Sequence, residues 1–180
     1  LDTRICADFP KINPVQIAID PGLPKEKHMR WAALLRHQAP EEAGAILRQL
    51  KLDNDTISKA KTLVQWWKRP IGADQTQIRK TMSQMAPELY DDLLILKASV
   101  GELELQAEGC VEDLDWVKAQ SGEIRQRGDC VSLKELAVTG ADLIQAGMKP
   151  GKELGETLKR LLELVLEHPE WNTKEILKKV

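Results

Sequence analysis

The chain has 180 residues and nearly balanced charge, with 26 Lys and Arg against 28 Asp and Glu. This length is sufficient for one or two domains with a buried core, and the net charge indicates no general preference for an anionic partner. The three cysteines, Cys6, Cys110 and Cys130, are widely spaced and indicate neither a disulfide framework nor a zinc site. No stretch reaches the roughly 18 consecutive apolar residues of a membrane span, and the polar N-terminus lacks the apolar core of a signal peptide, so we expect a cytoplasmic protein with no membrane partner.

Residues 1–27 are predicted to form a loop-rich N-terminal segment. They hold four of the nine prolines, namely Pro10, Pro14, Pro21 and Pro24. Each proline removes a backbone donor and restricts the residue before it, which disfavours a helix. The chain begins with Leu1 rather than methionine, so we allow for a fragment of a longer protein.

From residue 28 onward, apolar residues recur with the spacing i, i+3, i+4, i+7, and alternating β-branched runs are almost absent. This pattern predicts an all-α fold, an irregular helical bundle followed by a smaller helical tail. The expected helices cover residues 28–36, 40–50, about 54–67, 74–85, one starting at Pro87, and a long acidic helix over 101–124. The weakly hydrophobic "SGEIRQRGD" at 121–129 marks the expected boundary between a helical body domain, 28–126, and a helical tail domain, 127–180.

The predicted tail contains clear helix start and stop signals. Two capping boxes are expected, at Ser132 with Glu135 and at Thr139 with Asp142. Further on, Gly147 suits the left-handed position after a helix, and Pro150 suits the first turn of the next one. A leucine-rich stripe then runs to Pro169. A last capping box, at Asn172 with Glu175, is predicted to open the closing helix.

Catalytic motifs do not stand out in the sequence. The phosphate-binding loop, the dinucleotide-binding loop, the H-E-x-x-H zinc motif and the G-x-S-x-G nucleophile motif are all missing. His28, His37 and His168 are scattered, and we interpret them as ordinary surface or packing residues. We therefore predict no catalytic residue and no metal ligand in this chain.

Aromatic and basic residues give weaker signals for nucleic-acid binding. Trp31 and Trp67 are expected in the core. For Trp66, a place in the core and a base-stacking role are about equally supported. The basic group formed by Lys59, Lys61, Lys68 and Arg69 could meet phosphate, but solvated lysines on a helix surface are the simpler interpretation.

The stretch "GADLIQAGMKPGKELGETL", residues 140–158, has the sharpest pattern. A Gly147-x-x-Pro150-Gly151 turn between two helices leaves free amides at the start of the second helix, and Lys149 and Lys152 flank it. Such amides bind anions because they lack partners within the helix. The glycines, including Gly155, keep side chains away from a phosphate or from a neighbouring helix. Spacing alone leaves an anion site and a purely structural corner equally supported.

Residues 133–177, "LKELAVTGADLIQAGMKPGKELGETLKRLLELVLEHPEWNTKEIL", closely resemble the C-terminal tail of bacterial class II tRNA nucleotidyltransferases, the CCA-adding enzyme and poly(A) polymerase family. Upstream, "MRWAALLRH", "ILRQLKLDNDTI" and "IRKTM…DLLILKAS" resemble the body of the same family. The resemblance covers the chain from about residue 28 to its end.

The resemblance implies that different domains carry out catalysis, nucleotide selection and tRNA binding. In this family an N-terminal head carries the metal-binding carboxylates, a neck selects CTP or ATP, and the helical body and tail grip tRNA. This sequence has neither a G-S-x-R-like loop with a D-x-D pair nor an Arg-rich nucleotide-selecting helix. We therefore expect a tRNA-binding body and tail that is inactive alone. Mg and CTP or ATP would bind the head of the parent chain, and the residues expected to contact tRNA phosphates are Lys134, Lys149, Gly151 and Lys152.

The sequence differs from the phosphohydrolase-like relatives at positions that bear on the alternative functions. Relatives with a phosphohydrolase-like body have a His-Asp pair where this chain has Arg36 and His37, and they tend to have Asp where this chain has Ser99. Without these groups a two-metal hydrolase site is in doubt. A degenerate His-Asp phosphohydrolase-like domain remains one alternative function, and a helical protein-interaction module remains the other.

Overall fold

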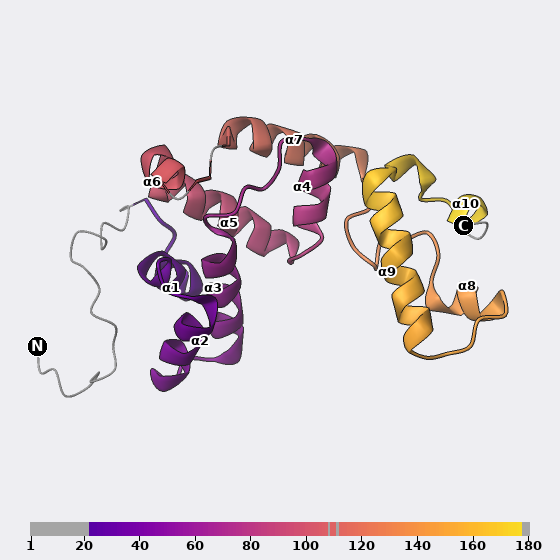
Figure 1. Cartoon of the computed structure of the whole chain (residues 1–180), viewed down its shortest axis with the longest axis horizontal. Helices are drawn as coiled ribbons and strands as arrows, with labels where there is room; N and C mark the ends of the chain where they lie inside the picture. The colour runs from indigo at the N-terminus through magenta and orange to yellow at the C-terminus, as the bar shows by residue number, and fades with distance from the viewer. Residues whose placement is uncertain (1–21, 108, 111, 178–180) are drawn as a thin grey trace, which may run out of the picture. The chain divides into compact units, whose positions relative to one another are not determined.

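The computed structural model describes residues 22–107, 109–110 and 112–177. Within these ranges the structure contains ten α-helices and no strand (Figure 1), which confirms the all-α prediction. No helix in the described ranges has the length and apolar character needed to cross a membrane. Most of the proline-rich segment, with Pro10, Pro14 and Pro21, lies outside the described residues. The remainder, 22–26, is not helical.

The chain divides into two compact units, which are described separately. Unit 1 comprises residues 1–70 and 87–114, and unit 2 comprises residues 71–86 and 115–180. Unit 2 therefore groups the predicted tail with an earlier segment of the chain. The expected division into a body, 28–126, and a tail, 127–180, stays a prediction.

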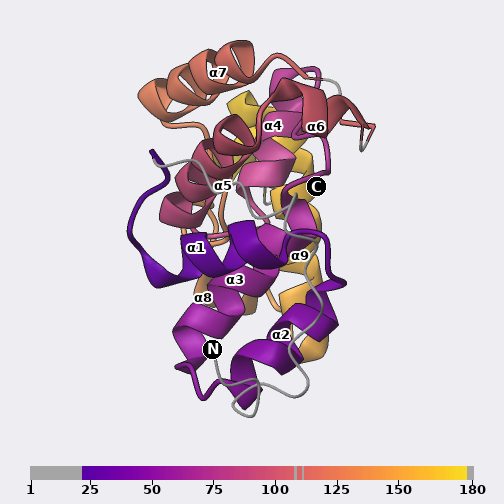
Figure 2. The same ribbon diagram turned by 90° about the vertical axis from the view of Figure 1, so that its left-hand side faces the viewer.

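Unit 1 is built around a central helix, α3. Its helices are α1 (Lys27–Leu35), α2 (Pro40–Gln49), α3 (Asn54–Trp66), α5 (Pro87–Val100) and α6 (Glu102–Ala107). α3 packs against α1, α2 and α5, and Figure 2 shows α1 and α2 beside it. Trp67 at the end of α3 is fully buried, as expected, and its indole donates a 2.5 Å hydrogen bond to the carbonyl of Arg36. Trp31 is only partly buried.

The helix starts in unit 1 follow from the sequence. Pro40 occupies the first turn of α2, where a missing amide has no cost. Asp53 caps α3 by accepting a 2.8 Å hydrogen bond from the amide of Thr56. Both starts agree with the predicted signals.

The predicted long helix over 101–124 is wrong. The structure has α6 in Glu102–Ala107 and then α7 in Leu114–Arg127. Gly109 lies at φ 79°, and the amides of Gly109 and Cys110 return to the carbonyls of Gln106 and Leu105. These bonds close the end of α6 in the manner of a Schellman turn. Apolar spacing continues across the break, which is why periodicity did not reveal it.

Unit 2 contains the remaining helices. These are α4 (Gln75–Met82), most of α7, α8 (Gly140–Gln145), α9 (Lys152–Glu167), the 3-10 helix η2 (Pro169–Trp171) and α10 (Lys174–Leu177). A buried apolar cluster, here called the tail core, comprises Cys130, Leu136, Val138, Leu143, Leu161, Val165 and Leu177. The leucine stripe of α9 supplies one side of this cluster, as its periodicity predicts.

Two predicted capping boxes in the tail are not formed. Residues 132–135 make a turn rather than a helix start, and the Glu135 carboxylate accepts from the amide of Val131. Asn172 does not cap α10. Its side-chain amide bonds the backbone of Glu135 and Ala137 instead, and the hydroxyl of Thr173 accepts from the amide of Ile176. Asparagine therefore joins two chain segments here, a role that local spacing does not reveal.

Candidate nucleic-acid interface

The α8–α9 hairpin begins with a complete capping box. The Thr139 hydroxyl accepts from the amide of Asp142 at 3.3 Å, and the Asp142 carboxylate accepts from the amide of Thr139 at 2.9 Å. This confirms the second predicted box. Lys174 of α10 donates a further 2.9 Å bond to Asp142, so the start of α8 is also connected to the C-terminal helix.

A glycine turn ends α8. Gly147 has φ 104°, its amide donates to the carbonyl of Ile144 at 2.9 Å, and the amide of Met148 donates to the carbonyl of Leu143 at 3.0 Å. These two bonds form a Schellman motif, in which glycine is favoured because it has no Cβ. Gly147 therefore has the predicted role. Pro150 lies one residue before the helix cap, Gly151, rather than in the first turn of α9.

The start of α9 is open to solvent. Gly151 is its N-cap and offers no side chain to the first amides, which therefore lack partners within the helix. Lys149 is exposed and forms no ion pair within the described residues. The Lys152 side chain is 91% exposed, with its ammonium 3.6 Å from the carboxylate of Glu156. Glu153 places an acidic group in the first turn, so the local charge is mixed rather than strongly basic.

The glycines of the hairpin have different surroundings. A Cβ on Gly140 would lie 3.4 Å from the end of the Leu154 side chain, which is an ordinary van der Waals contact. A Cβ on Gly151 or Gly155 would meet nothing within 4 Å. Gly155 therefore does not serve close helix packing, the structural role weighed for it from the sequence.

Lys134 is separate from the hairpin in its contacts. It is exposed in the turn at 132–135, a turn that bonds to Asn172, and no described contact joins it to α8 or α9. The structure brings Lys149, Gly151 and Lys152 together and does not group Lys134 with them.

One further lysine near the hairpin was not predicted from the sequence to contact tRNA phosphates. Lys159 is exposed and lies at i+7 from Lys152 and i+4 from Gly155, which places it on the same side of α9. The signal that could have found it is this helical spacing.

The capping box gives a pH-dependent prediction. Hydrogen bonds from Thr139, and then from Lys174, hold the pKa of Asp142 well below its ordinary value of 3.8. Because the folded pKa is lowered, the stabilisation is complete above about pH 4 and is lost as the pH falls through the folded pKa. We expect Asp142→Asn to lower stability at pH 7 and to flatten the fall in melting temperature below pH 4. Melting curves from pH 7 to pH 2 measure this, and parallel profiles for both proteins would contradict it.

Two lysines of the other basic group have carboxylate partners in unit 1. Lys59 pairs with Asp55 at 2.7 Å and Lys61 pairs with Glu41 at 2.7 Å. Arg69 lies over the ring of Trp66, 5.3 Å from its centroid. Because both lysines are paired and Arg69 is stacked on a ring, this group is a poorer candidate for phosphate than the hairpin.

Arg36 and His37, which replace the hydrolase pair, both contact one carboxylate. The Arg36 guanidinium is buried and donates to the two oxygens of Glu104 at 2.7 and 3.2 Å. His37 lies 3.1 Å from the same carboxylate and packs edge-on against Trp67. The Ser99 hydroxyl donates to the carbonyl of Leu96, one turn back on its own helix, at 2.8 Å. Both Glu104 oxygens are thus occupied by a guanidinium, an arrangement that builds a salt bridge.

Within the described residues, no group of three or more His, Cys, Asp or Glu side chains is arranged to hold a metal ion.

The family model described as tRNA nucleotidyltransferase domain 2 matches residues 24–180. The chain belongs to this family.

The match to tRNA nucleotidyltransferase domain 2 starts before α1 and runs through α10, so the family covers both compact units rather than the tail alone. This confirms the predicted relation to the body and tail of a tRNA nucleotidyltransferase. No curated protein and no solved structure matches the chain. RNA contact by Lys134, Lys149, Gly151 and Lys152 stays a prediction.

Proposed function

We propose that this chain is the tRNA-holding, non-catalytic portion of a tRNA nucleotidyltransferase, and that the start of α9 contacts the tRNA backbone. Membership of the tRNA nucleotidyltransferase domain 2 family supports tRNA as the ligand. The observation that carries the location is the open start of α9, where amides without a side-chain cap lie beside Lys149 and Lys152.

Backbone and shape recognition fits this surface. An A-form acceptor stem has a deep, narrow major groove that side chains cannot read, whereas its phosphates are accessible. Helix N-termini and lysines are common phosphate partners, and such contacts position the protein without reading sequence. Gly151 and Gly155 leave free space beside these groups, so a sugar-phosphate chain can approach the helix closely.

Nucleotide addition belongs, in this proposal, to the head and neck of the parent protein. Mg and CTP or ATP would bind there, and the present chain would hold the tRNA so that its 3′ end reaches that site. The Arg36–Glu104 salt bridge supports a scaffold role for unit 1, because it ties α1 to α6 at the place where hydrolase relatives carry the His-Asp pair.

Substitution of Gly155 tests the proposal. Gly155→Gln adds a bulky neutral side chain to an exposed helix position with free space around it. Because glutamine is a better helix former than glycine, we expect stability to rise by about 0.5–1 kcal/mol. We expect tRNA affinity to fall about tenfold at 50 mM salt, on the order of one lost phosphate contact or more. Fluorescence anisotropy with labelled tRNA measures the affinity.

Gly122→Gln is the matched control. Gly122 is an exposed glycine of α7 whose Cβ would also meet nothing within 4 Å. We expect the same gain in stability and no change in tRNA affinity. Equal affinities for the two variants would remove the α9 surface from the tRNA interface.

A further inference from the structure

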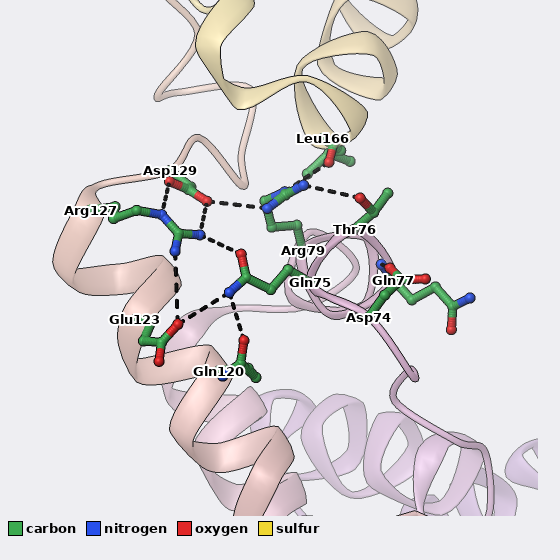
Figure 3. A network of polar contacts seen from close by, with 10 residues as sticks. All are labelled: Asp74, Gln75, Thr76, Gln77, Arg79, Gln120, Glu123, Arg127, Asp129 and Leu166. Carbon is green, nitrogen blue, oxygen red and sulfur yellow. Dashed lines mark hydrogen bonds and ion pairs between the residues drawn. The ribbon is translucent and has the colours of Figure 1, made fainter.

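One buried guanidinium joins three elements of unit 2. Arg79, on α4, is 4% exposed. Its Nε donates to the carbonyl of Leu166 at 2.8 Å, its Nη1 to Asp129 at 3.3 Å and its Nη2 to the hydroxyl of Thr76 at 3.1 Å (Figure 3). These four groups are called the Arg79 joint. It connects α4 to the segment after α7 and to the last turn of α9.

The Arg79 joint supplies a hydrogen-bond donor for a backbone carbonyl that has no partner within α9. The last four carbonyls of a helix have no partner within it, and Leu166 lies one residue before the end of α9. A cation at this end also interacts favourably with the helix dipole. Arg79 therefore fixes the C-terminal end of α9 rather than an arbitrary point of its surface.

A second arginine holds the acceptor in place. The Asp129 side chain is 7% exposed and also accepts from Arg127 at 2.8 and 3.2 Å. Arg127 donates to Gln75 at 2.7 Å, and Gln75 donates to Gln120 at 2.6 Å (Figure 3). The Asp129 carboxylate, which holds the guanidinium that binds α9, is thus fixed between α4 and α7.

The tail core does not include α4 or α7. All of its buried members lie within residues 130–177, and Leu166 is outside it. The described polar contacts of α4 with α9 are the buried Arg79 bond and an exposed pair between Lys80 and Glu167, 2.7 Å apart. An exposed pair contributes little, whereas breaking a buried one is costly. The Arg79 joint is therefore the contact that fixes the direction of α9 relative to α4.

The length of α9 converts a small tilt into a large displacement. Its 16 residues span about 24 Å, at about 1.5 Å per residue. A tilt of about 10° at the C-terminal end would move the N-terminal end by about 4 Å, which exceeds the roughly 3 Å length of a hydrogen bond. Phosphate contacts at Lys149 and Lys152 thus require a fixed direction of α9.

We infer that Arg79 is a positioning residue for tRNA binding: by fixing the C-terminal end of α9 it sets where the α8–α9 hairpin meets the tRNA backbone. This inference rests on the proposed function for its ligand. It extends that function to a buried residue that does not touch the tRNA. A guanidinium suits this role because its planar fork donates in several fixed directions at once, which an ammonium does not do.

A distance measurement tests the joint independently of tRNA. Spin labels at Lys118→Cys on α7 and Glu153→Cys on α9 occupy exposed positions of the full chain. Cys6→Ser removes one native thiol, and the buried Cys110 and Cys130 are shielded from labelling. Double electron–electron resonance should give one narrow distance for the parent and a distribution at least about twice as wide for Arg79→Met. An unchanged width in Arg79→Met would overturn the joint.

Matched variants distinguish a loss of the fixed direction of α9 from a loss of charge and from a failure to fold. Lys80→Met removes the same charge from the next residue of α4 and should leave the distance distribution unchanged. Arg79→Lys should give an intermediate width, because one ammonium replaces part of the fork. Asp129→Asn keeps the shape of the acceptor while weakening both arginine contacts, and it should also broaden the distribution if Arg79→Met does not fold.

Binding then tests the positioning role. Where melting curves show folded protein, Arg79→Met should lower tRNA affinity about tenfold at 50 mM salt. Lys149→Gln with Lys152→Gln should cause little further loss in the Arg79→Met background, because those contacts are already gone. Full additivity, or unchanged affinity in Arg79→Met, would overturn the positioning role. Failure of the unmodified chain to bind tRNA would instead overturn the proposed function, while the distance widths would still decide the joint.

Discussion

Replacing Glu112 with alanine should lower the free energy of unfolding by about 3–5 kcal/mol, the cost of leaving a buried charge without its partner. Lys97 is fully buried, and its ammonium donates to Glu112 at 2.5 Å, to the carbonyl of Arg69 at 2.7 Å and to the thiol of Cys110 at 3.2 Å. The Glu112 side chain is itself 6% exposed. Its removal leaves the Lys97 ammonium inside unit 1, and the acceptors that remain among the described residues, the carbonyl of Arg69 and the thiol of Cys110, are neutral.

Two controls define this effect. Lys61→Met breaks a pair of similar length with Glu41, whose side chain is 79% exposed, and it should cost less than about 1 kcal/mol. Lys97→Met combined with Glu112→Leu replaces both charges with apolar groups and should recover most of the loss. Urea unfolding measures all three. A cost below about 1 kcal/mol for Glu112→Ala would show that the pair is not buried as described.

Reversing the two hairpin charges should have the largest effect on binding. A non-specific affinity near 10⁻⁵ M shared by about six to ten phosphate contacts corresponds to about 1 kcal/mol per contact. We therefore expect Lys149→Glu with Lys152→Glu to weaken tRNA binding by at least about 30-fold at 50 mM salt. Both side chains are exposed, so the melting temperature should change little.

The control for this variant carries the same change in net charge. Lys25 and Lys118 are exposed and form no ion pair within the described residues. Their joint reversal to glutamate should weaken binding only slightly, through the general field of the protein. If both double variants lose affinity equally, the contact is diffuse and the hairpin has no special part in it.

Several helix starts and one turn of this protein were predictable because local rules decide them. The Asp53 cap, Pro40 in the first turn of α2, and the Thr139–Asp142 box all form as the spacing indicates. The glycine turn at Gly147 also follows from its sequence. Each of these features depends on residues within one or two helical turns of one another.

The buried charges were not predictable in the same way. Arg36 follows the last residue of α1, and Arg79 and Lys97 lie within helices, where a charged residue is usually found on a solvated face. Their carboxylate partners, Glu104, Asp129 and Glu112, lie 68, 50 and 15 residues further along the chain. Only the tertiary fold brings these pairs together.

For the candidate site, the sequence located the turn but not the roles of all its glycines. Gly155 is four residues from Gly151 and has the spacing of a close helix contact, yet the space beside it is open. A Cβ on Gly140, in the first turn of α8, would make an ordinary contact with the end of the Leu154 side chain. The space beside each glycine depends on packing between helices, which local spacing does not reveal.

The most direct measurement is the salt dependence of tRNA binding by the unmodified chain. Each phosphate contact contributes about −0.7 to −0.9 to the slope of log affinity against log salt concentration. We expect measurable binding at 50 mM salt, and a slope that becomes shallower by about 2 when Lys149 and Lys152 are both changed to glutamine. No binding at 50 mM salt, or the same slope for both proteins, would contradict this expectation.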